Sequence, residues 1–180
     1  MERLATILER EGEALEQLLF KLIETKLLLV ADEARFLPRA TREVERARSR
    51  ARELDLVRAA TVARTGAGTR LRELATTAEG PWPAILRDHH DLLTRLVDEI
   101  DVVAHQNACA AERGLTALRC EPVPVGAGVG AGGPLGSSVV ATGRPIRNAE
   151  LDRLARGAAL EAVLGTAARL RMPDLIDFLR

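Results

Sequence analysis

Aromatic residues are scarce in this sequence, which contains three Phe, one Trp and no Tyr. Proteins that stack nucleobases or enclose small molecules rely on aromatic side chains, so this scarcity argues against both functions. An excess of charge of either sign is also absent, because 26 basic residues balance 26 acidic ones. No global field therefore favours nucleic acid or an anionic membrane as a partner.

Cysteines and long hydrophobic runs are also sparse. Cys109 and Cys120 are too few and too poorly spaced for a disulfide framework or a zinc knuckle, which fits a reducing cytosol. The first residues are acidic and lack the apolar core of a signal peptide. The richest apolar run, residues 18–31, is interrupted by three charged residues and is too short between them to span a bilayer. We therefore expect a cytoplasmic protein with no direct membrane insertion.

Helix-forming residues, by contrast, are abundant and follow amphipathic patterns. Ala, Glu, Lys, Leu and Arg make up about 56% of the chain, a proportion typical of long helices and coiled coils. Apolar residues recur at steps of three and four over residues 2–30, 37–54 and 84–118, which predicts three helices, each with one apolar stripe. The first stripe is Leu4, Leu8, Glu11, Leu15, Leu18, Leu22, Thr25 and Leu29, widened by Ile7, Leu19 and Ile23. Such stripes must be hidden from water, so we predict an all-α fold, an elongated antiparallel helical bundle with coiled-coil-like packing.

Two breaks and one change of composition divide the chain. Residues 65–69 and the GPWP sequence at residues 80–83 predict turns between helices. Residues 121–147 are rich in Gly, Pro, Val and Ser, which is typical of a flexible linker. Asn148 then offers an N-cap to a last amphipathic helix. We predict a helical bundle over residues 1–120, a linker over residues 121–147 and a C-terminal amphipathic segment over residues 148–180.

Motifs for catalysis or ligand binding lack the context that they need. Gly128, Gly130 and Gly133 spell GxGxxG, but no helix N-terminus follows to hold a pyrophosphate. His105 and Cys109 lie one helical turn apart, yet a zinc site would need two further ligands on the same patch. No Ser or Cys is recognisably paired with a base. We therefore expect no cofactor, no bound metal and no enzymatic activity.

Arginines crowd the second predicted helix, within PRATREVERARSRARELDLVR at residues 38–58. A row of arginines can bind phosphates, so a nucleic-acid binder that uses this helix is one alternative function. The arginines, however, alternate with Glu43, Glu45, Glu53 and Asp55 and spread around the helix, which favours a solvated and ion-paired face. We expect no nucleic acid among the partners.

Two segments resemble the FlgN-type flagellar export chaperones. ILEREGEALEQLLFKLIETKLLLVADEARFL at residues 7–37 resembles the first helix of that family, with its Leu-rich stripe and the acidic break after it. DLLTRLVDEIDVVAHQNACAAERGL at residues 91–115 is similar to the family's later long helix, in which an Asn recurs at a position like that of Asn107. The resemblance implies a cytoplasmic chaperone that binds hook-filament junction proteins (hook-associated proteins), prevents their premature assembly and delivers them to the flagellar export gate. A structural coiled-coil adaptor with an unrelated partner is the main alternative.

Asn107 interrupts the apolar stripe of the third predicted helix. Leu92, Leu96, Ile100, Val103, Asn107, Ala111 and Leu115 follow one another at steps of four or three, which places the amide on the buried face. Buried Asn is known to fix helix register at some cost in stability, and we favour this role. The alternative, implied by the resemblance, is that Asn107 shapes a contact with a client or with the export gate.

The C-terminal segment carries an apolar face that a free helix could not keep in water. That face could cover the bundle, pair with a second copy of the chain or bind a client protein. A Gly-rich linker of 27 residues would let it reach much of the bundle's surface. We predict that it binds the client, through Leu160, Val163, Leu164, Leu170, Leu175, Ile176 and Leu179.

Overall fold

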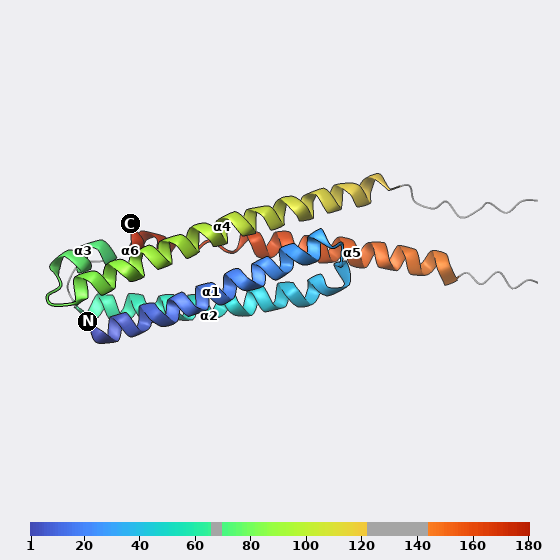
Figure 1. Ribbon diagram of the computed structural model, residues 1–180. Helices are drawn as coiled ribbons and strands as arrows, with labels where there is room; N and C mark the ends of the chain where they lie inside the picture. The colour runs from blue at the N-terminus through green and yellow to red at the C-terminus, as the bar shows by residue number, and fades with distance from the viewer. Residues whose placement is uncertain (66–69, 122–143) are drawn as a thin grey trace, which may run out of the picture.

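The computed structural model describes residues 1–65, 70–121 and 144–180, and in this part of the chain every regular element is helical. The elements are α1 (Glu2–Val30), the 3-10 helix η1 (Ala34–Phe36), α2 (Leu37–Thr65), α3 (Leu71–Thr77), α4 (Trp82–Cys120), α5 (Arg144–Ala168) and α6 (Pro173–Leu179). The long helices pack side by side into an elongated bundle (Figure 1). The all-α prediction is confirmed.

Helices α1 and α2 form an antiparallel pair joined by a tight turn. Asp32 adopts a left-handed conformation, with a φ angle of 57°. The amide of Asp32 donates to Leu29, and the amide of Glu33 donates to Leu28. These two hydrogen bonds make a Schellman motif, which satisfies the last carbonyl groups of α1. The turn is short, so α2 returns directly along α1.

Helix α4 runs the length of the bundle. Its 39 residues span about 58 Å at ~1.5 Å per residue. Gly80, which has a φ angle of 67°, and Pro81 precede it, and a second proline, Pro83, lies in its first turn, where proline costs little. Helix α4 lies parallel to α1, and α2 runs the opposite way (Figure 1).

Helices α5 and α6 return along the bundle. Helix α5 packs on α4 and α2, and α6 packs on α4 and α3. The Nε2 atom of His90 on α4 donates to the carbonyl oxygen of Leu179, 3.0 Å away, which ties the end of α6 to the bundle. Helices α4 and α5 also extend together beyond the α1–α2 turn (Figure 1).

The start of α5 corrects one detail of the sequence prediction. The helix begins at Arg144, so Asn148 lies within it and is not its N-cap. The last four residues of the predicted linker, residues 144–147, are therefore helical. Most of that linker lies outside the described residues, and so does the GxGxxG spelling within it.

The buried apolar residues form two clusters along the bundle. The larger cluster joins α1, α2, α3 and α4 to the end of the chain and includes Leu8, Leu15, Leu93, Ile100 and Leu175. The smaller cluster lies toward the α1–α2 turn and comprises Leu37, Ala111, Leu118, Ala159, Leu160 and Val163. In the smaller cluster α4 and α5 approach closely, because a Cβ at Gly114 would lie 2.9 Å from the Leu160 Cδ1 atom.

Candidate partner-binding surfaces

The apolar tail residues predicted to bind a client lie against the bundle. Five of them are buried in the two apolar clusters: Leu160, Val163, Leu170, Leu175 and Leu179. Leu164 and Ile176 are partly buried and pack against the same clusters. In this structure the tail therefore covers the bundle, which is the first of the three arrangements considered. Client contact through these side chains would require α5 and α6 to leave the bundle.

A buried group of charged side chains lies between α1 and α2, beside Phe178 of α6. The Nε atom of Arg58 is 3.2 Å from Oε1 and 3.1 Å from Oε2 of Glu11, and the same guanidinium binds Asp55. The ring of Phe178 on α6 lies 4.0 Å from the guanidinium carbon, in a cation–π arrangement. The tail thus covers polar groups as well as apolar ones.

The Glu11 carboxyl shares Arg58 with a second carboxyl, that of Asp55. Burial raises the pKa of Glu11 to about 7, and the attraction of Arg58 opposes this effect without cancelling it. The negative charge of the neighbouring Asp55 carboxyl adds a smaller rise in the pKa of Glu11. Glu11 therefore changes its protonation state near neutral pH.

Asn107 is buried between α1 and α4, as its place on the apolar stripe predicts. Its Nδ2 atom donates to the carbonyl oxygen of Leu22, 2.9 Å away, and only 2% of the residue is exposed. Its Oδ1 atom has no hydrogen-bond partner. The amide joins a specific turn of α4 to a specific turn of α1, which is the geometry that a register-fixing role requires.

An apolar stripe on the outer face of α1 is open to solvent. It consists of Phe20, Ile23, Leu27 and Val30, which are 56%, 40%, 61% and 76% exposed. Beside it, a groove of about 620 Å³ lies between α1 and α4. Leu19 and Ile23 line the groove from α1, and Val102 and Val103 line it from α4. We call the stripe and this groove together the α1–α4 surface.

Sequence reasoning assigned part of this surface to the core. Ile23 was placed on the edge of the buried stripe, whereas 40% of it is exposed. The available signal was a second row of apolar residues, at positions 20, 23, 27 and 30, with the same three-and-four spacing on another side of the helix. Two such rows make α1 apolar over most of its circumference near its end. The sequence alone does not say which row faces the bundle.

The first two thirds of the chain match a known protein family. The family model described as FlgN protein matches residues 1–119, about two thirds of the chain. The chain belongs to the FlgN family. This agrees with the resemblance carried by the first and third long helices, and FlgN proteins are chaperones of flagellar export. No curated protein and no solved structure matches the chain.

The FlgN match coincides with the helices that form the α1–α4 surface. It includes α1, α2 and α3 and ends within the last turn of α4. Asn107 and the α1–α4 surface therefore belong to the FlgN portion. Helices α5 and α6 follow it, so the predicted client-binding residues of the tail lie outside the match.

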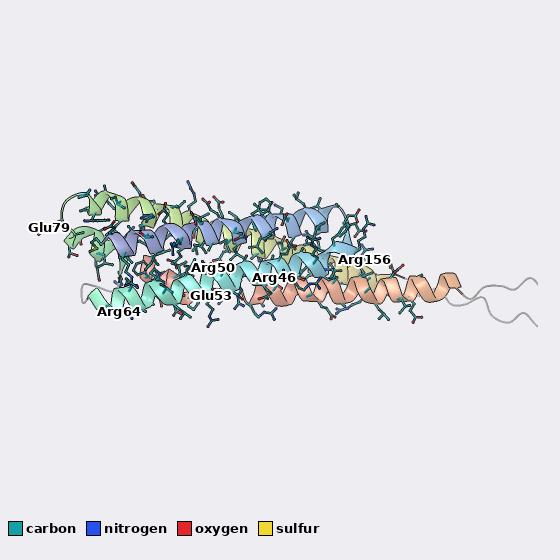
Figure 2. The ribbon with its side chains drawn as sticks, turned by 90° about the horizontal axis from the view of Figure 1, so that it is seen from below. Arg46, Arg50, Glu53, Arg64, Glu79 and Arg156 are labelled. Carbon is teal, nitrogen blue, oxygen red and sulfur yellow. The ribbon has the colours of Figure 1, made fainter. Side chains whose placement is uncertain are left out.

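The arginines of α2 in this FlgN chain are partly ion-paired along the helix. Arg39 pairs with Glu43 at 2.9 Å, and Arg50 pairs with Glu53 at 3.4 Å. Figure 2 shows Arg46, Arg50, Glu53 and Arg64 along this helix. These two pairs within the helix agree with a solvated and partly ion-paired face.

Within the ranges that the structure describes, no group of three or more His, Cys, Asp or Glu side chains is arranged to hold a metal ion. Cys109 Sγ lies 3.6 Å from His105 Nε2, and no third ligand completes this pair. Within the same ranges no helix is both long enough and apolar enough to cross a membrane.

Proposed function

We propose that this FlgN-family chaperone binds hook-filament junction proteins in the cytoplasm, prevents their premature assembly and delivers them to the flagellar export gate. The family match over residues 1–119 carries the proposal. The open apolar stripe on α1 supports it, because a chaperone needs an unpartnered apolar surface to cover a client's own. Covering such a segment requires neither ATP nor a cofactor.

Co-purification with the junction proteins of the same organism tests this proposal. The tagged chain is expressed with each junction protein in turn, and with flagellin as a control client. We expect a stable complex with at least one junction protein on size-exclusion chromatography, and suppression of that protein's aggregation in light scattering. Failure to bind any junction protein would favour the alternative, a structural coiled-coil adaptor with an unrelated partner.

Client binding by the tail is a separate proposal. Leu160, Leu170 and Leu175 contact the bundle in the free chain, so the client would have to displace α5 and α6. The test is a chain that ends before Arg147, assayed for junction-protein capture at a temperature at which it remains folded. Loss of capture would support a binding role for the tail. Unchanged capture would place the client on the surface of the first four helices.

A further inference from the structure

We propose that the α1–α4 surface binds an amphipathic helix of a client protein, one whose apolar stripe is accompanied by Lys or Arg residues. This inference rests on the proposed chaperone function and specifies the part of the client that is recognised. It follows from three features of the described residues, namely the spacing of the exposed side chains, the arrangement of the tail and the charge around the groove.

The spacing points to a helical occupant. Exposed residues on the outer face of α1 follow one another at steps of four and three without interruption: Glu9, Glu13, Glu16, Phe20, Ile23, Leu27 and Val30. This is the heptad spacing with which one helix packs along another. The first three positions are acidic and the last four are apolar. A helix that lay along this face would meet carboxylates over one half and apolar side chains over the other.

The described parts of the tail do not cover this face. Helix α5 packs on α2 and α4, and α6 packs on α3 and α4. Phe20, Leu27 and Val30 each keep more than half of their surface exposed with both tail helices in place. The tail helices therefore leave the apolar stripe largely open, and among its side chains Phe20 contacts the Lys21 ammonium, which lies 5.2 Å from the centre of its ring.

The charge around the groove selects a basic occupant. Asp91, Asp98 and Glu99 line the groove from α4. Two arginines, Arg72 of α3 and Arg95 of α4, also line it. Glu9, Glu13 and Glu16 on α1 bring the carboxylates of this surface to six, and Lys26, whose Nζ atom donates to Gln106 across α1 and α4, brings the cations to three. Of the six, only Asp91 has a carboxylate within ion-pair distance of a basic side chain among the described residues, with its Oδ1 atom 3.0 Å from Nδ1 of His90. A helix with Lys or Arg beside its apolar stripe would compensate this charge, whereas an acidic helix would be repelled.

A pair of synthetic peptides tests the inference directly. Both are labelled 25-residue helices with Leu at the heptad positions, and they differ only in carrying Lys or Glu at the flanking positions. Fluorescence anisotropy measures their binding to the full chain at low and moderate salt. We expect the Lys peptide to bind at least tenfold more tightly than the Glu peptide. Equal binding of the two peptides would overturn the charge argument.

A matched pair of double variants locates the binding site. Phe20→Gln with Leu27→Gln removes exposed apolar area from α1, and Leu56→Gln with Val57→Gln removes a similar area from α2. Leu27 and Leu56 are both 61% exposed, so neither pair should change the melting temperature by more than a few degrees. We expect the α1 variant to lose tenfold or more in affinity for the Lys peptide and the α2 variant to bind as the unchanged chain does. Equal effects of the two variants would overturn the proposed site.

The same variants distinguish failure of this inference from failure of the proposed function. If the unchanged chain captures a junction protein and the α1 variant captures it equally well, the chaperone function stands and the α1–α4 surface is not its client site. If the unchanged chain captures no junction protein, the proposed function fails whatever the peptides do. Light scattering adds a third outcome, because a dimer that the α1 substitutions dissociate would identify the occupant as a second copy of the chain and overturn the client assignment.

Discussion

At the scale of single residues, charges are buried where they can be shared. Glu11, Asp55 and Arg58 are each less than 10% exposed, although burying an unpaired charge costs several kcal/mol. The guanidinium of Arg58 binds both carboxylates, and Phe178 covers its face. Removal of Arg58 would leave two carboxyl groups buried without a cation.

The raised pKa of Glu11 predicts a pH dependence of stability. Folding raises this pKa from 4.5 to about 7, so between these values the folded chain holds a proton that the unfolded chain has released. The free energy that Glu11 contributes is therefore fully present below about pH 4.5 and is lost as the pH rises to 7. We expect Glu11→Gln to flatten the fall in melting temperature over this range. Glu13→Gln, a change at an exposed position of the same helix, is the control.

Other groups should not obscure this measurement. Lys21 and Arg39 hold the pKa of Glu43 at about 2. The free energy that the Glu43 carboxylate contributes to folding is therefore fully present above pH 4.5 and declines only under more acidic conditions. The difference between the melting curves of the unchanged chain and of the Glu11 variant, recorded by circular dichroism between pH 4.5 and 8, isolates the contribution of Glu11. Parallel curves for the unchanged chain and the Glu11 variant would show that its proton is not linked to folding.

The Asn107→Leu substitution tests whether the amide serves register. The Leu22 carbonyl oxygen accepts a hydrogen bond from Nδ2 of Asn107. Because Leu22 lies within α1, the same oxygen also accepts the helical hydrogen bond from the backbone amide four residues later. Leucine would remove the unpaired Oδ1 atom without orphaning that carbonyl. We expect the free energy of unfolding to stay within about 1 kcal/mol of the original value or to rise, with a looser alignment of α1 and α4. A loss of several kcal/mol in a thermal melt would contradict a role limited to register.

Sequence reasoning succeeds at the residue scale where a position alone decides burial. The stepping of apolar residues placed Glu11 and Asn107 on buried faces, and both are buried. It could not identify the partner of Glu11, because Arg58 lies 47 residues away and is one of many arginines on α2. Such pairings depend on how two helices align, which periodicity does not determine.

At the scale of elements, the apolar patterns predicted the long helices and their turns. Prediction was weakest at two boundaries. The apolar pattern of α2 ended at Leu54, whereas the helix continues to Thr65, and Asn148 suggested an N-cap although α5 begins four residues earlier. It was also incomplete for α1, where Ile23 was assigned to the buried row although it belongs to a second, exposed apolar row. Local patterns show that a helix is amphipathic, but the tertiary arrangement decides which row is covered.

At the scale of the whole molecule, the tail joins both apolar clusters. Leu160 and Val163 belong to the smaller cluster, and Leu170, Leu175 and Phe178 belong to the larger one. The sequence left open whether the apolar face of the tail covers the bundle, pairs with another copy of the chain or binds a client. All three hide the same apolar area from water, so composition and spacing could not choose among them.

Deletion of residues 147–180 should therefore destabilise the bundle. Each buried Leu, Val or Phe contributes about 1.5–3 kcal/mol, and the ordering of the tail offsets only part of this sum. We expect the melting temperature to fall by about 10 °C or more for a chain of this size. A change of only a few degrees in a calorimetric scan would mean that the tail is loosely attached and free to bind a client.

The turn that leads into α4 also determines what an optical experiment can observe. Trp82 is the only tryptophan in the chain and there is no tyrosine, so near-ultraviolet emission comes almost entirely from the first residue of α4. That residue lies at the α3 end of the bundle, far from the smaller apolar cluster (Figure 1). Tryptophan fluorescence therefore reports on the α3–α4 turn. It does not detect fraying of α4 and α5 where they extend beyond the α1–α2 turn. A fluorophore attached at Cys120, the exposed thiol in the last turn of α4, would report on the other end.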